Sequence, residues 1–322
     1  MERGHESMIS KKDRILGGLM GLLIGDALGV PYEFNDPSDL PPREKIELNP
    51  PDGFVRSHRG VLPGTWSDDG AQALCLLDSL LECKTMNIHN FASKLLAWYE
   101  YGLWAVGNDV FDVGNQTAVS LRAYKDGVPP NESGFQILDG KGNGSLMRVL
   151  PLALWHKGSN EELVYFAHKQ SLVTHGHVIN QVCCALYCLW AKGILNDFSI
   201  DEAYKEAVKE LRGIYRKDSD YHNELEYCLR PDDEPFGKGG GYVVDSFRST
   251  RMVLKNESSY EDVVKASVSL GHDTDTTAAI AGGLAGIAYG FNSIPNRWLL
   301  ALRGKEELNP LINGLLVHLD IV

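Results

Sequence analysis

The chain has 322 residues, of which 43% are hydrophobic and 23% are charged, a composition that excludes a disordered, collagen-like or coiled-coil protein. Its 31 Lys and Arg against 43 Asp and Glu give a net charge of −12, which disfavours a general nucleic-acid-binding protein because binding to phosphates needs clustered basic residues. A local basic groove, and therefore a nucleic-acid substrate, stays open.

The first predicted helix covers residues 11–28, after a flexible tail of the first ~10 residues. Basic residues followed by an apolar stretch loosely imitate a secretory signal. Gly17 and neighbouring glycines interrupt that stretch, however, and Asp26 stands where a cleavage site needs a small neutral residue. We therefore expect a buried, tightly packed first helix.

Helical periodicity continues along the rest of the chain, and the alternation typical of strands is nearly absent. A helix is predicted over 68–83 with Ser67 as its N-cap. The longest apolar run, Val182 to Ala191, is shorter than the ~18 to 20 residues of a membrane span, so we expect a core helix and no membrane partner. We predict an all-α fold in one domain, residues 1–322. Further helices are predicted over 88–103, 116–126, 145–156, 160–172, 177–195, 201–216, 221–228, 242–255, 259–269, 276–290 and 296–302, and long functional loops over 30–66, 104–115, 128–144 and 229–241.

Six cysteines are too few for a disulfide scaffold in a chain of this length. Cys183, Cys184 and Cys188 lie in one apolar run, a spacing more typical of a helix core than of zinc ligands. Reduced thiols suggest a cytoplasmic protein, and we expect a monomer.

Three acidic clusters lie at predicted helix ends. One acid there is explained by the positive end of the helix dipole, worth roughly 0.3 to 1 kcal/mol. Two acids at one helix start crowd like charges, which is unfavourable unless a cation neutralises them. Carboxylates and hydroxyls together form an all-oxygen donor set that suits Mg²⁺ or Mn²⁺, and several carboxylates could hold two ions. The clusters are Asp26 with Glu33, then Ser67-Asp68-Asp69, then Asp273-Thr274-Asp275-Thr276.

Other interpretations of the last cluster fail. A calcium-binding EF-hand loop needs Gly at position six and Glu at position twelve, but Ala278 and Leu284 stand there. A haloacid-dehalogenase-type phosphatase carries a similar motif after its first strand, whereas here it lies near the C-terminus. The chain has no Walker loop and no dinucleotide-binding fingerprint.

Two glycine-bearing loops could bind phosphates through backbone N–H groups. The first, Gly140 to Ser145, leads into a predicted helix; the second ends at Tyr242, an aromatic that could stack on a base. Each also fits an ordinary turn. His175, in Thr174-His175-Gly176-His177, is equally compatible with a structural role.

Taken together, these motifs resemble the ADP-ribosylglycohydrolases, the family that contains the dinitrogenase reductase-activating glycohydrolase. The resemblance covers nearly the whole chain, in the same order. Its motifs are Gly25-Asp26-Ala27-Leu28-Gly29 with Glu33, Trp66-Ser67-Asp68-Asp69, Gly142-Asn143-Gly144-Ser145-Leu146-Met147-Arg148 with Pro151, Thr174-His175, and Gly271-His272-Asp273-Thr274-Asp275-Thr276.

The resemblance implies a compact orthogonal multi-helix domain, a binuclear Mg²⁺ or Mn²⁺ site, and hydrolysis of the bond between ribose C1″ of ADP-ribose and an acceptor. It implies catalytic roles for Glu33, Asp68, Asp69 and Asp275. The implied metal ligands are Ser67, Asp68, Asp69, Asp273, Asp275 and Thr276, and the implied ADP-ribose-binding residues are Gly142, Asn143, Gly144, Ser145, His175 and, less directly, Tyr242.

The sequence departs from the family pattern at three positions. Ser67 stands where Thr is common, Gly70 where Thr or Ser is common, and His272 where Gly is common. Asp112, in a loop that resembles a bacterial subgroup feature, is a further candidate for substrate binding, with a capped loop as the alternative. ADP-ribosyl-arginine on a protein is the first choice of substrate. Serine-linked or nucleic-acid-linked ADP-ribose, a catalytically silent ADP-ribose-binding module and a helical scaffold are the alternatives.

Overall fold

The computed structural model describes residues 9–321, so the predicted tail lies almost wholly outside the described residues. Within that range the fold is all-α, as predicted, with fourteen α-helices and no strand; Gly142 and Tyr242 form an isolated antiparallel bridge. The helices are α1 Lys11–Gly29, α2 Asp68–Cys83, α3 Ile88–Tyr101, α4 Asn115–Lys125, α5 Leu150–Trp155, α6 Asn160–Leu172, α7 Val178–Leu195, α8 Ile200–Ile214, α9 Asp220–Asn223, α10 Val243–Asn256, α11 Tyr260–Val268, α12 Thr274–Tyr289, α13 Asn296–Ala301 and α14 Asn309–His318, and a π-helical segment, Glu224–Leu229, follows α9.

The predicted helices agree closely with the observed ones, with two differences. The helix expected over 145–156 begins only at Leu150, where Pro151 occupies its first turn; the preceding residues form turns at the candidate site. The short helix α14 was not predicted. It also begins with a proline, Pro310, and only a few of its side chains are buried.

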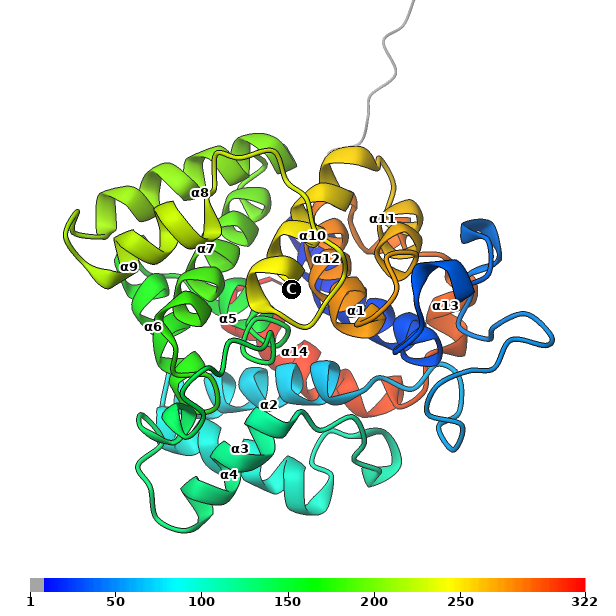
Figure 1. Ribbon diagram of the computed structural model, residues 1–322, viewed down its shortest axis with the longest axis horizontal. Helices are drawn as coiled ribbons and strands as arrows, with labels where there is room; N and C mark the ends of the chain where they lie inside the picture. Colours follow the sequence, from blue (N-terminus) through cyan, green and yellow to red (C-terminus); the bar gives the residue numbers. More distant parts are fainter. Residues whose placement is uncertain (1–8, 322) are drawn as a thin grey trace, which may run out of the picture.

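Close packing of α1 against α12 organises the centre of the molecule, where Figure 1 shows the two helices side by side. Glycines recur every fourth residue on one face of α1, at Gly17, Gly21, Gly25 and Gly29. A Cβ added to Gly17 would lie 2.1 Å from the carbonyl oxygen of Gly286, and one added to Gly29 would lie 2.3 Å from Cα of Asp275. The glycines therefore let the two backbones touch, in agreement with the expectation of a buried, tightly packed first helix.

Two helical segments, Lys11–Tyr32 and Val178–Leu195, are long and apolar enough to cross a membrane by length and composition alone. Within the fold, 94% of the apolar window of the first and 78% of that of the second are buried. Burial in the protein core accounts for their hydrophobicity, in agreement with the expectation of core helices.

Candidate functional site

Asp26 connects the end of α1 to the start of α2. Its fully buried carboxylate accepts hydrogen bonds from the backbone N–H groups of Ser67, at 2.8 Å, and Gly70, at 2.7 Å. It thereby caps the first turn of α2 from outside the helix. The Ser67 side chain adds an internal cap, accepting from the Asp69 N–H and donating to Asp69 Oδ2 at 3.0 Å.

The starts of α2 and α12 meet beside Asp26. Thr276 Oγ1 lies 3.3 Å from Asp69 Oδ2, across 207 residues of sequence. Carboxylate oxygens of Asp26, Asp69 and Asp275 all lie within 4.8 Å of one another, and so do those of Glu33, Asp273 and Asp275. The acidic clusters that are far apart in sequence therefore converge in space.

In the described part of the chain, His58 beside Glu33 is the basic side chain in contact with these carboxylates. Asp26, Asp69 and Asp275 form no ion pair within the described chain, and Asp69 Oδ1 and Asp275 Oδ2 are buried without any hydrogen-bond partner. Burial, followed by the neighbouring acids, raises the pKa of Asp69 and Asp275 well above the usual range, and burial raises the pKa of Asp26 to about 7. Unpartnered, closely spaced oxygens of this kind fit divalent cations.

Asp68, in the first turn of α2, lines a cavity of about 300 Å³ together with Glu33 and Asp273. Gln72, one helical turn later, donates to Asp68 Oδ2 at 3.0 Å and accepts from buried Arg148 at 2.8 Å. Gln170 holds Arg148 through its side-chain and backbone oxygens. Sequence reasoning gave Gln72 and Arg148 no role; the four-residue spacing of Gln72 from Asp68 was an available signal.

Glu33 lies at the same cavity and contacts a residue that the sequence did not indicate, His58. Glu33 Oε2 is 2.7 Å from His58 Nε2, and Asp112 is 4.0 Å from the same nitrogen. The His58 ring lies between Phe34 and Phe111, with ring centroids 5.6 and 5.1 Å away. Burial and the acids nearby, Asp112 first, raise the pKa of Glu33 to about 10.

The glycine-bearing loop forms the opposite wall. Asn143 Nδ2 donates to Asp273 Oδ2 at 2.7 Å and so connects the loop to the acidic group. A Cβ on Gly144 would lie 2.6 Å from His175 Cε1, so only glycine permits this approach. His175 Nδ1 is 2.8 Å from the Thr174 hydroxyl, and burial lowers the pKa of His175 far enough to keep it neutral.

Most of the predicted site residues share this one cavity. Ser145 does not line it: its buried hydroxyl accepts from Ser171 at 2.8 Å and supports the loop from behind. Tyr242 is 45% exposed and reaches the loop through its backbone bridge to Gly142. The predicted residues that line the cavity are Glu33, Asp68, Asp112, Gly142, Asn143, Gly144, His175, Asp273 and Thr276, and Gln116 and Thr117 line it without having been predicted.

Comparison with known proteins agrees with the family resemblance of the sequence motifs. A family model described as ADP-ribosylglycohydrolase matches residues 7–320. The chain is 29% identical over 306 residues to ADP-ribosylarginine hydrolase Tri1 from Serratia proteamaculans (strain 568), covering 94% of this chain and 79% of the relative. It is 29% identical over 303 residues to ADP-ribosyl-[dinitrogen reductase] glycohydrolase from Rhodospirillum rubrum, and the match covers 92% of this chain and 93% of the relative.

A solved structure, described as an ADP-ribosylglycohydrolase-related protein complex, superimposes with a TM-score of 0.77 at 28% identity. The match covers 95% of this chain and 97% of the solved chain.

Proposed function

The chain belongs to the ADP-ribosylglycohydrolase family, whose members are hydrolases, and from this premise we propose that it releases ADP-ribose from ADP-ribosyl-arginine on a protein with the help of two divalent cations, Mg²⁺ or Mn²⁺. The observation that carries this proposal is the convergence of buried, unpartnered carboxylate oxygens at the starts of α2 and α12. A site that only bound ADP-ribose would gain nothing from this unfavourable crowding of charge.

The proposed metal ligands are Ser67, Asp68, Asp69, Asp273, Asp275 and Thr276. Divalent cations bound there would lower the pKa of a water molecule and polarise the ribose hydroxyls. Gln72 and Arg148 hold the Asp68 carboxylate in position, and Asn143 does the same for Asp273. These contacts fix the directions of the oxygens from the protein side.

We assign the proton transfer to Glu33. In the reaction, the water oxygen bonds to C1″, the bond from C1″ to the acceptor nitrogen breaks, and its electron pair stays with the leaving guanidine. The proton lost by the water must reach that nitrogen. Glu33 lies at the cavity beside Asp273 and Asp275, and its carboxylate contacts His58, so it is placed to accept the proton of the water and to pass it to the leaving nitrogen.

Asn143, Gly144 and neutral His175 would bind the ADP-ribose on the opposite wall. Backbone N–H groups of this loop suit the diphosphate. Ser145 and Tyr242 contribute indirectly, the first by supporting the loop and the second by its backbone bridge.

Arginine is the proposed acceptor because the relative from Serratia proteamaculans is named an ADP-ribosylarginine hydrolase, and because carboxylates at the cavity attract a guanidinium. Serine- and nucleic-acid-linked ADP-ribose remain alternatives. The departure at Gly70 gives little support to a silent binding module. A Cβ there would lie 2.8 Å from Leu23 and 2.9 Å from Trp66, so glycine suits the local packing, and its N–H still caps the helix through Asp26.

The cysteines bear on the environment of the protein. All six are free, and four of them are buried. This pattern supports our proposal of a cytoplasmic protein. We also propose one domain, residues 1–322, and a monomer.

The test is release of ADP-ribose from arginine-, serine- and nucleic-acid-linked substrates, measured by mass spectrometry with Mg²⁺, with Mn²⁺ and with excess EDTA. We expect release from the arginine-linked substrate, and none in EDTA. Full activity in EDTA would refute the metal role, and tight ADP-ribose binding without any release would favour the binding module.

A further inference from the structure

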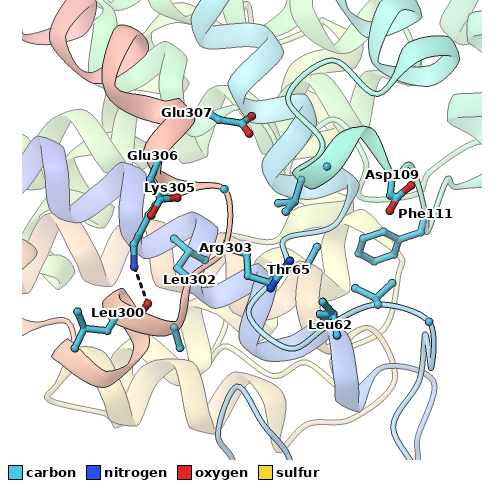
Figure 2. A pocket seen from close by; sticks show the side chains of 16 residues that line it. Leu62, Thr65, Asp109, Phe111, Leu300, Leu302, Arg303, Lys305, Glu306 and Glu307 are labelled. Carbon is cyan, nitrogen blue, oxygen red and sulfur yellow. Dashed lines mark hydrogen bonds between the residues drawn. The ribbon is translucent and has the colours of Figure 1, made fainter.

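A second, larger cavity adjoins the candidate site. Its volume is about 630 Å³, against about 300 Å³ for the cavity of the site. Three segments line it: the loop around Leu62, the loop that contains Asp109 and Phe111, and residues 300–307, which begin in the last turn of α13. Figure 2 shows the 300–307 segment on one wall and Asp109 with Phe111 on the other, with open space between them. We name this cavity the outer groove.

One short segment forms the wall between the outer groove and the site. Asp109 and Phe111 line the groove, whereas Asp112 lines the site. Phe111 also packs against His58, which contacts Glu33. A chain that left the site on its Glu33 side, away from the ADP-ribose-binding loop, would therefore enter the outer groove.

The groove has a rigid floor. The Arg303 N–H donates to the Gly64 carbonyl at 2.9 Å, and a Cβ on Gly64 would lie 2.4 Å from the Ala301 carbonyl oxygen. Gly304 packs against Trp66, which directly precedes Ser67 and the metal-binding turn of α2. The floor of the groove and the catalytic helix are thus parts of one packed structure.

The rim of the groove combines apolar and acidic side chains. Leu62 and Leu300 are 54% and 69% exposed. Glu306, Glu307 and Asp109 form no ion pair within the described residues. Two basic side chains, Arg303 and Lys305, also line the groove, so the three carboxylates outnumber the cations; Lys305 donates to the carbonyl oxygens of Leu299 and Leu300.

We propose that the outer groove binds the polypeptide that flanks the modified arginine, and that it favours a basic, extended segment of the acceptor protein. This inference rests on the proposed function. Exposed leucines provide contacts for any polypeptide, and the unpaired carboxylates select positive charge. The same carboxylates repel the phosphates of a nucleic acid.

The test compares two arginine-linked substrates: an ADP-ribosylated protein with a basic sequence around the arginine, and free ADP-ribosyl-arginine. The variants are Glu306→Lys with Glu307→Lys, and separately Leu300→Asp. Asp218→Lys with Asp220→Lys, at the exposed start of α9, is the control matched for charge, and Val317→Asp, at a 76% exposed residue of α14, is the control for hydrophobicity.

We expect the double variant to lower the ratio of kcat/KM for the protein substrate to that for the free substrate by about tenfold, through KM, and less so at high salt. Leu300→Asp should lower the ratio in the same direction, and the two controls should not change it. An unchanged ratio in both groove variants, while free ADP-ribosyl-arginine is still cleaved, would overturn the groove and leave the proposed function intact.

Equal losses on both substrates would also overturn the groove, since they would indicate damage to the catalytic site. A gain on a nucleic-acid-linked substrate in the double variant, with the protein substrate unaffected, would assign the groove to nucleic acid instead. A wild-type protein that cleaves neither arginine-linked substrate would overturn the proposed function, and this inference with it.

Discussion

Two groups of acidic side chains in this protein have opposite electrostatic surroundings. In the first, Asp26, Asp69 and Asp275 lie together with no basic partner among residues 9–321, and each has a raised pKa. In the second, where the loop after α1 meets α11 and α13, Glu47 is surrounded by cations. Its carboxylate is 3.1 Å from Lys265 and 2.9 Å from Arg297.

The pKa of Glu47 shows the effect of those cations. Partial burial opposes its ionisation, but hydrogen bonds from Arg297, Trp298 and Lys265 outweigh burial and leave its pKa lowered. The pKa values of the two groups thus shift in opposite directions, because basic side chains in the described part of the protein pair with Glu47 and not with the carboxylates of the first group. We propose that the first group takes its cations from solution and needs them for function, whereas the second is an internal structural contact.

Removing one charge from the first group should have the largest effect on activity. We expect Asp275→Asn, which keeps the shape of the side chain, to reduce turnover by about 10³-fold, because it removes an oxygen charge from the metal site. In EDTA the same variant should unfold at higher urea than the wild type, since one buried like charge is gone. Activity assays and urea titrations measure the two effects; a variant that lost both activity and stability would contradict the comparison.

Forcing α1 away from α12 should break the first group without touching an acid. A Cβ on Gly286 would lie 1.9 Å from the Gly17 carbonyl oxygen, so Gly286→Ala should lower the free energy of unfolding by about 3 kcal/mol and reduce turnover as well. Gly213→Ala is the matched control. That glycine lies in α8 with no atom near its added Cβ, and the change should be neutral or stabilising by up to ~1 kcal/mol. Equal effects of the two changes in denaturant titrations would exclude the helix contact as the cause.

The pH dependence of stability should distinguish the metal-free protein from the loaded one. Raised pKa values, about 7 for Asp26, about 6 for Asp112 and about 10 for Glu33, mean that the folded state keeps protons that the unfolded chain releases near its ordinary values of 3.8 to 4.5. Their stabilising contribution is therefore full below about pH 4 and is lost as the pH rises from there to each folded pKa, about 6 for Asp112, about 7 for Asp26 and about 10 for Glu33. In EDTA, the urea midpoint should fall over that range, and saturating Mg²⁺ should remove most of the fall. A midpoint that rises with pH in EDTA would refute the electrostatic description of the site.

Removing the charge of Glu47, in the second group, should lower stability instead of activity, and by a small amount. Glu47→Gln removes a partner of two cations, so we expect a loss of about 1 kcal/mol in the free energy of unfolding and no change in turnover. Thermal unfolding in 0.1 and 1 M salt measures it, with a smaller loss in high salt. A large loss of activity would show that the two groups are not independent.

Local signals explain what could be predicted from the sequence. Ser67 marked the start of α2, and periodic apolar residues marked most other helices, because both depend on interactions within a few residues. The convergence of the acidic clusters was also predictable, since crowded like charges need a common cation. The glycines of α1 indicated close packing, although they did not identify α12 as the partner.

What could not be predicted depends on long-range contacts of irregular loops. His58 lies in a loop without periodicity and has a positive φ of 49°, as Phe34 and Asp112 beside it have φ of 61° and 55°. Only the folded chain brings these three residues together. The outer groove has the same origin, because its walls come from three loops that are distant in the sequence.

The contact between Gly29 and the start of α12 carries a consequence for biosynthesis. Thr274 donates its hydroxyl proton to the Gly29 carbonyl across 245 residues. At about 5 to 20 residues per second, a ribosome needs roughly 10 to 50 s to produce the partner of the first helix. During that interval the glycine face of this very apolar helix is without its cover, so the nascent chain is a candidate client for chaperones, and no truncated product that ends before residue 274 can assemble the acidic centre.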